Sequence, residues 1–227
     1  MGWRKDINMY ILEIIMLKIE PFEKHVSEYE AWFENNRFVY ESEIMAIKRQ
    51  LPKKGEGVEV GVGSGHFAAP LGIRFGVDPS SKMRTLARNR GIEVIDGVAE
   101  NLPFENCRFS FVLMVTTICF LDDIEASFKE VYRILKPGSH IIIGFIDKDS
   151  LVGKLYQQHK NESEFYKEAT FYSVEEVTSN LKEAGFINLK FTQTIFHRLS
   201  AIKKLEPTKV GYGEGAFVVV KALKPKK

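Results

Sequence analysis

Three glycines that alternate with other residues directly after an apolar run are the feature of this sequence with the clearest chemical meaning. The run is Val58 to Val60, and Gly61, Gly63 and Gly65 follow it. Because glycine has no Cβ, such a turn can adopt positive φ and lets a ligand approach the main chain closely. The segment therefore predicts a nucleotide-binding turn. Its spacing is Gly-x-Gly-x-Gly, whereas the dinucleotide fingerprint Gly-x-Gly-x-x-Gly would need Gly or Ala where this chain has His66.

Two acids accompany this turn. Glu59 lies two residues before the first glycine, and Asp78 follows a second apolar run nineteen residues later. A carboxylate at the end of the second strand of a nucleotide-binding βαβ unit accepts hydrogen bonds from both hydroxyls of an unphosphorylated ribose. The competing interpretation is that Asp78 is a turn residue before Pro79. Its combination with the glycines favours the ribose assignment.

Short β-rich runs alternate with helical segments after residue 55, which is typical of βαβ units in a mostly parallel sheet. The expected strands are residues 58–60, 75–77, 93–95, 109–115, 140–145, 189–196 and 216–222. N-cap residues ahead of apolar helix faces are Ser80, Asp122 and Ser173. A further helix is expected over 151–159, and apolar residues at steps of three and four predict two helices over 23–51. These elements indicate one α/β domain at 51–227, preceded by a helical extension at 1–50.

The composition is that of an ordinary globular protein of 227 residues, with 44% hydrophobic residues, 27% charged residues and a formal net charge of +2. The near balance of charge disfavours nucleic acid as a partner. Two cysteines make no disulfide framework, which predicts a cytoplasmic protein, and five histidines without ligand spacing predict no metal site. The apolar run 9–19 is too short to cross a bilayer, so no membrane segment is expected. The role of residues 1–20 and the oligomeric state stay open.

Four blocks of the chain resemble, in order, the class I S-adenosylmethionine-dependent methyltransferases. They are VEVGVGSG at 58–65, FGVDPS at 75–80, GVAENLPF at 97–104 and EVYRILKPGS at 130–139. The last two are the more specific, because neither is expected in a nicotinamide dehydrogenase. The resemblance implies a Rossmann-like α/β fold with a seven-stranded, mostly parallel sheet, its last strand inserted antiparallel, helices on both faces and an N-terminal helical lid.

The resemblance also implies which residues bind the cofactor, S-adenosyl-L-methionine. They are Glu59, Gly61, Gly63, Gly65, Asp78, Pro79, Ser80, Val98, Ala99, Glu100, Val115, Thr116, Arg37 and Trp32. Glu59 and the glycines would surround the methionine part, and Asp78 would hold the ribose. Many family members have an acid where this chain has Val98, so Glu100 or a backbone carbonyl would have to accept from the adenine amino group.

Two residues of the leading helices have implied roles in a lid. Trp32 is suited to lie over the sulfonium by cation–π attraction, and Arg37 is suited to pair with the amino-acid carboxylate. The alternative is an amphipathic helix that only covers the sheet.

The predicted function is methyl transfer to a small-molecule oxygen, nitrogen or carbon nucleophile. No catalytic residue is assigned, since the cofactor already carries an activated methyl group and the protein mainly has to align the acceptor. His66 and His159 are possible bases, and the segment 148–172 is where the family sets acceptor specificity. Two alternatives stay open: a cofactor-binding protein without catalysis, and a nicotinamide-dependent oxidoreductase.

Overall fold

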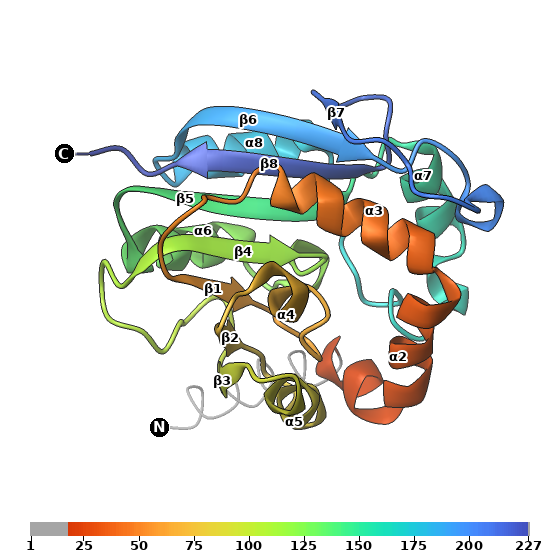
Figure 1. The fold of residues 1–227 in the computed structure, drawn as a ribbon, viewed down its shortest axis with the longest axis horizontal. Coiled ribbons are helices and arrows are strands. Elements are labelled where there is room, and N and C mark those ends of the chain that lie inside the picture. The colour runs from red at the N-terminus through yellow and green to blue at the C-terminus, as the bar shows by residue number, and fades with distance from the viewer. Residues whose placement is uncertain (1–17, 227) are drawn as a thin grey trace, which may run out of the picture.

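One eight-stranded sheet forms the centre of the molecule, with strand order β3-β2-β1-β4-β5-β8-β6-β7 (Figure 1). The structure is a computed structural model, and it describes residues 18–226. The strands are β1 Gly57–Val60, β2 Phe75–Val77, β3 Glu93–Ile95, β4 Phe109–Val115, β5 Leu135–Ile146, β6 Ile187–Thr194, β7 Lys209–Val210 and β8 Phe217–Leu223. Strands β1 to β5 are parallel, and β8 runs antiparallel between β5 and β6. The Rossmann-like α/β prediction, with the last strand inserted antiparallel, is confirmed.

The sequence prediction of seven strands is wrong by one. The additional strand, β7, is two residues long and lies at the edge of the sheet, where it pairs with β6. Such a short edge strand contains too few residues to show an alternation of apolar and polar side chains. Strand β5 also begins earlier than expected, because Leu135 pairs with Phe109 across an irregularity in the register.

The helices lie on both faces of the sheet. They are α2 Val26–Asn35, α3 Arg37–Lys48, α4 Ala68–Leu71, α5 Ser81–Asn89, α6 Ile124–Ile134, α7 Leu151–Gln158 and α8 Val174–Glu183, with short 3-10 turns η1 Ile118–Phe120, η2 Lys160–Glu162 and η3 Leu199–Ala201. Residues 18–24 are also helical. Figure 1 shows α3, α4 and α5 in front of the sheet and α6 and α8 behind it. Two clusters of buried apolar side chains fill these layers.

Local capping accounts for where three of the helices start. The side chains of Ser80 and Ser173 accept hydrogen bonds from the main chain of α5 and α8, as expected, and Ser173 forms a full capping box. The N-cap of α6 is Asp123 rather than the predicted Asp122, whose carboxylate instead pairs with Lys18. Two adjacent acids are equally suitable as caps by type, so the sequence did not distinguish them.

The two leading helices have different surroundings. Helix α3 packs against the sheet: the hydroxyl of Thr192 donates to the carbonyl of Ala46 at 3.2 Å, and the Glu206 N–H donates to the hydroxyl of Ser42 at 2.9 Å. Residues 18–35, which we call the lid segment, instead lie beside the carboxyl ends of the parallel strands. No helix within residues 18–226 is both long enough and apolar enough to cross a membrane.

Candidate active site

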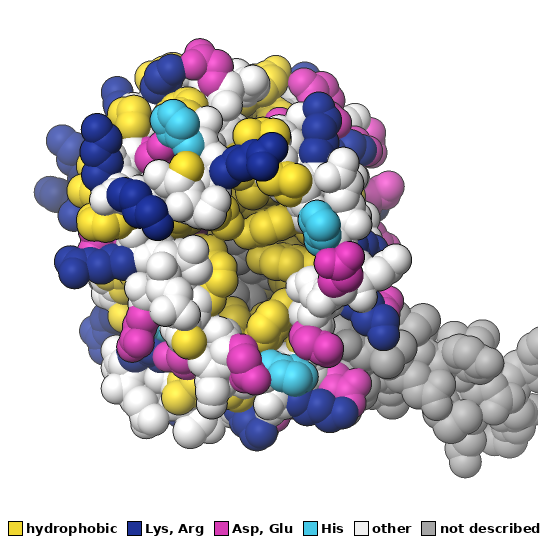
Figure 2. Space-filling view, turned by 90° about the vertical axis from the view of Figure 1, so that its right-hand side faces the viewer, with side chains coloured by type: hydrophobic (Ala, Val, Ile, Leu, Met, Phe, Trp, Pro, Cys, Tyr) yellow, Lys and Arg dark blue, Asp and Glu magenta, His cyan; other side chains and the backbone are white. Residues whose placement is uncertain are grey.

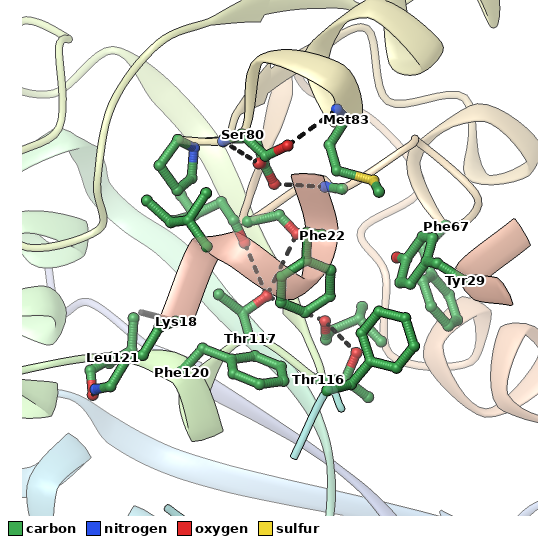
Figure 3. Close-up of a pocket in the computed structure, with 18 of the residues that line it drawn as sticks. Lys18, Phe22, Tyr29, Phe67, Ser80, Met83, Thr116, Thr117, Phe120 and Leu121 are labelled. Carbon is green, nitrogen blue, oxygen red and sulfur yellow. Dashed lines mark hydrogen bonds between the residues drawn. The ribbon is translucent and has the colours of Figure 1, made fainter. Parts of the chain in front are cut away.

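The carboxyl ends of the parallel strands open into a cavity of ≈ 250 Å³. Connections leave β1 and β4 toward opposite faces of the sheet, and ligands of open α/β sheets bind at such a switch point. Figure 2 looks onto this side of the molecule and shows a hollow in which hydrophobic side chains gather, with charged side chains around it. Figure 3 shows residues that line the cavity.

The glycine turn after β1 forms one wall of the cavity. Gly61 and Gly63 have φ values of +69° and +54°. A Cβ at Gly61 would lie 2.3 Å from Cγ2 of Thr117, and a Cβ at Gly63 would lie 2.8 Å from the hydroxyl oxygen of Tyr29. Both backbone conformation and lack of space therefore require glycine here. Gly65 lies outside the cavity lining, where a Cβ would meet Ile92.

Asp78 lies next to this turn and is only 7% exposed. Its Oδ2 accepts the N–H of Gly63 at 2.7 Å, and its Oδ1 accepts the N–H of Ser80 at 2.9 Å. Burial raises the pKa of Asp78 to about 6. Since each carboxylate oxygen has two lone pairs, both can accept one more hydrogen bond from a ligand in the cavity. Two hydroxyls on adjacent carbons would match this arrangement.

Glu59 is buried in the middle of β1 and does not line the cavity. Its carboxyl accepts the backbone N–H of Ala68, whereas Oε2 has no hydrogen-bond partner among the described residues. Burial raises the pKa of Glu59 well above its ordinary value. The geometry connects Glu59 to the start of α4 rather than to the cavity surface.

The wall beyond Asp78 is formed by Pro79, Ser80, Val98, Ala99 and Glu100. The main chain carries the loop between β3 and β4 past the cavity here, with Val98 bridging to Asn101. Glu100 Oε1 accepts the N–H of Asp122 at 2.9 Å and also that of Asp123. One oxygen of Glu100 is thus engaged in holding the loop ahead of α6.

The end of β4 separates the two halves of the cavity. Val115 and Thr116 line it, and Thr116 has φ of +50°. A β-branched residue in this region is a genuine outlier, of the kind found at functional sites. Cys119 follows closely, with its thiol 3.2 Å from the carbonyl of Thr116. Burial raises the pKa of Cys119 to about 12, which keeps it a neutral thiol rather than a nucleophile.

The lid segment covers the cavity with aromatic side chains. The ring of Phe22 lies 5.7 Å from that of Tyr29, 5.2 Å from Phe120 and 5.5 Å from Phe165, centroid to centroid. Trp32 also lines the cavity. These edge-to-face and tilted contacts join the lid segment to the loops after β4 and α7.

Polar contacts hold the lid segment at two of its sides. The hydroxyl of Ser80 donates to Glu23 Oε1 at 2.8 Å. On the opposite side, Lys18 Nζ lies 2.6 Å from the carboxylate of Asp122 and donates to the carbonyl of Leu121 at 2.8 Å. The lid segment is thereby attached next to α5 and next to α6.

Arg37 is not brought to the cavity. Its guanidinium pairs with Glu41 at 2.6 Å, one helical turn further along α3, and 73% of its side chain is exposed. The two candidate bases also lie outside the cavity lining. The ring of His66 stacks on Phe33 at 3.7 Å, and His159 is exposed beside Glu162.

Several residues that line the cavity were not predicted from the sequence to lie there. Among them are Lys18, Phe22, Glu43, Phe120, Phe165 and Tyr166. The aromatic composition of 165–172 was visible, but which of these rings would face a cavity was not. No three His, Cys, Asp or Glu side chains lie close enough to hold a metal ion within the part of the chain that the structure describes.

Comparison with known proteins identifies the family. A family described as "Methyltransferase domain" matches residues 58–143. An uncharacterised protein of Methanocaldococcus jannaschii is 48% identical over 203 residues, 89% of this chain and 98% of that one. A demethylmenaquinone methyltransferase of Staphylococcus aureus is 25% identical over 192 residues, covering 69% of this chain and 80% of the relative.

A solved structure from Thermotoga maritima is also similar. It is described as an S-adenosylmethionine-dependent methyltransferase and possible histamine N-methyltransferase, and it is 50% identical with a TM-score of 0.89. The alignment covers 91% of this chain and 99% of that one. The chain therefore belongs to the S-adenosylmethionine-dependent methyltransferases of class I, as its four sequence blocks predicted. Its cofactor is S-adenosylmethionine. A glycine turn without side chains, next to a buried carboxylate that can accept further hydrogen bonds, fits that molecule.

Proposed function

We propose that this protein transfers the methyl group of S-adenosylmethionine to a small-molecule acceptor bound in the same cavity. The observation that carries the proposal is the continuity of the cavity, which runs from Gly63 and Asp78 past Thr116 to the end of β5. One continuous cavity thus borders both the residues suited to the cofactor and a second set suited to another ligand.

In this proposal the main chain at Gly61 and Gly63 borders the methionine part, and Asp78 accepts the two ribose hydroxyls. The adenine lies between Pro79 and Ser80 on one side and 98–100 on the other. When bound, the cofactor supplies a methyl group that its sulfonium has already activated. The protein residues then orient the two ligands in line and exclude water.

The other residues that the sequence predicts for the cofactor site take supporting places. Val115, Thr116 and Trp32 border the reacting end of the cofactor. Glu59 and Gly65 support the turn from outside the cavity lining, and Arg37 has no part in the proposed site. The lid segment covers the bound ligands, whereas α3 stays packed on the sheet.

The relatives do not agree on one acceptor. The Thermotoga protein is described as a possible histamine N-methyltransferase, and the Staphylococcus protein is named as a demethylmenaquinone methyltransferase. Both acceptors are small molecules, which supports the acceptor class proposed here. A cofactor-binding protein without turnover remains the second candidate, and the family assignment gives the nicotinamide-dependent alternative no support.

Isothermal titration with S-adenosylhomocysteine, alongside NADH, tests the cofactor part of the proposal. We expect binding of S-adenosylhomocysteine, none of NADH, and at least about tenfold weaker S-adenosylhomocysteine binding by Asp78→Ala. Release of S-adenosylhomocysteine from S-adenosylmethionine with a panel of small amines, phenols and thiols, histamine included, tests turnover. Cofactor binding without turnover on any class of acceptor would favour the second candidate.

A further inference from the structure

The cavity has a second half that the proposed cofactor site does not use. It lies toward the end of β5 and is bordered by Val39, Glu43, Ile146, Tyr156, Tyr166 and Leu199. Strand β5 is separated from β2 by β1 and β4, so its end lies about 14 Å from the end of β2 at ordinary strand spacing. A ligand there would approach the reacting end of the cofactor from the side opposite the ribose.

Glu43 is the charged residue of this second half. It lies on α3 one turn after Val39, so both side chains share the helix face that borders the cavity. Although it carries a carboxyl group, Glu43 is only 4% exposed. It forms no hydrogen bond and no ion pair with any described residue.

The other charged residues that line the cavity all have partners. They are Lys18 and Asp122, which pair with each other, Glu28 beside His25, Asp78 on the N–H groups of Gly63 and Ser80, and Glu100 on the N–H of Asp122. A buried carboxyl group normally has a hydrogen-bond or ionic partner, because burial without one is costly. The exception at Glu43 therefore indicates that its partner is a ligand.

The side chains around Glu43 indicate which chemical class of ligand would bind there. The rings of Tyr156 and Tyr166 stack with centroids 5.0 Å apart, and Tyr166 stacks on Phe120 at 6.0 Å. The hydroxyls of both tyrosines make no hydrogen bond within residues 18–226. Stacked aromatic rings with one acid favour an organic cation with an apolar body, through ring faces and carboxylate together.

Resting on the proposed function, we propose that the methyl acceptor is a small primary or secondary amine with an apolar body, and that Glu43 binds its ammonium and receives its proton. The N–H proton passes to the carboxylate oxygen of Glu43, which frees the nitrogen lone pair. That lone pair forms the new N–C bond to the methyl group while the C–S bond of the cofactor breaks. The electron pair of the broken C–S bond stays on sulfur. The product is the N-methylated ammonium together with S-adenosylhomocysteine.

The electrostatics around Glu43 agree with this role. Burial alone raises the pKa of Glu43 to about 8, so near neutral pH its ionised form is the minor one and readily takes up a proton from a bound ammonium. The titratable groups that face it are Tyr40 on its own helix, Tyr156 on α7 and Tyr166 after η2. All three phenols have raised pKa values and stay neutral in this range.

The test is titration of the full chain, saturated with S-adenosylhomocysteine, with matched amine and alcohol probes. The pairs are 2-phenylethylamine with 2-phenylethanol, benzylamine with benzyl alcohol, and cyclohexylmethylamine with cyclohexylmethanol. We expect at least one amine to bind about tenfold or more tightly than its alcohol. Glu43→Gln should remove that preference, while Glu41→Gln, on the exposed side of the same helix, should leave it unchanged.

The same variants are then assayed for turnover with S-adenosylmethionine and the preferred amine. Loss of turnover in Glu43→Gln, with unchanged S-adenosylhomocysteine affinity and a cooperative melting curve, supports the proton-accepting role. If all amines bind no better than their alcohols, or Glu43→Gln keeps the preference and the turnover, the inference is wrong. Failure to bind S-adenosylhomocysteine at all would instead overturn the proposed function.

Discussion

Asp78 borders the cavity as a carboxyl group whose pKa burial has raised to about 6, so the affinity for S-adenosylhomocysteine should fall as the pH falls below this value. Only the ionised carboxylate can accept from two ribose hydroxyls while it also accepts from the N–H groups of Gly63 and Ser80. Between pH 7 and pH 5 the ionised fraction drops from about nine-tenths to about one-tenth. Binding should weaken about tenfold, or roughly 1.4 kcal/mol.

Isothermal titration at pH 5, 6 and 7 measures this dependence. The ligand itself does not interfere, because its α-carboxyl and α-amino groups titrate outside this range. His66 has a lowered pKa and lies outside the cavity lining. The Asp78→Ala variant retains His66, so a pH dependence that is lost in this variant comes from Asp78 and not from His66. We expect Asp78→Ala to bind at least about tenfold more weakly at pH 7 and to lose the pH dependence. The same slope in wild type and variant would refute the ribose assignment.

Three other predictions follow from the same geometry. Gly63→Val should abolish S-adenosylhomocysteine binding in titration while circular dichroism shows the fold retained, since a Cβ there meets Tyr29; normal binding would remove the turn from the site. Glu43 has a folded-state pKa of about 8, above its ordinary 4.5, so its contribution to stability is present below 4.5 and is lost as the pH rises through about 8. Between pH 6 and 9 the unfolding free energy of the wild type should therefore fall up to about 3 kcal/mol more than that of Glu43→Gln in urea titrations, and equal slopes would contradict this. Iodoacetamide should modify the exposed Cys107 and spare the buried Cys119 in the native protein, as peptide mass spectrometry would show; rapid labelling of Cys119 would mean that its surroundings open readily.

The positions of the glycine turn and of Asp78 beside the cavity could be predicted because they are encoded locally. The glycine turn needs positive φ at Gly61 and Gly63, and only the glycine residues themselves satisfy that requirement. Asp78 ends a strand whose neighbour in the sheet is also its neighbour in sequence. The mostly parallel sheet could be predicted from the alternating strand and helix patterns for the same reason, since each βαβ unit is formed by consecutive residues.

The acceptor side depends on contacts that no local pattern contains. Glu43 reaches the cavity because α3 packs across β5, β6 and β8, which includes the hydrogen bond between Thr192 and Ala46, 146 residues apart. In the sequence it is one acid on an amphipathic helix. Arg37 shows the converse case: a charged residue near the expected site had a local partner, Glu41, four residues away. Helical spacing could have indicated that pair.

The distribution of acids around the cavity suggests how two cationic ligands can share it. Asp78 and Glu43 both have pKa values raised mainly by burial, and they lie in opposite halves. Each of these carboxyl groups would be stabilised in its ionised form by a ligand that brings hydrogen-bond donors or positive charge. A sulfonium and an ammonium held close together would repel each other in a cavity lined mainly by apolar side chains. Transfer of the ammonium proton to Glu43 removes that repulsion and produces the neutral nucleophile in the same step. In the proposed reaction, recognition of the acceptor and its activation therefore depend on one carboxylate, and its replacement by an amide should impair both.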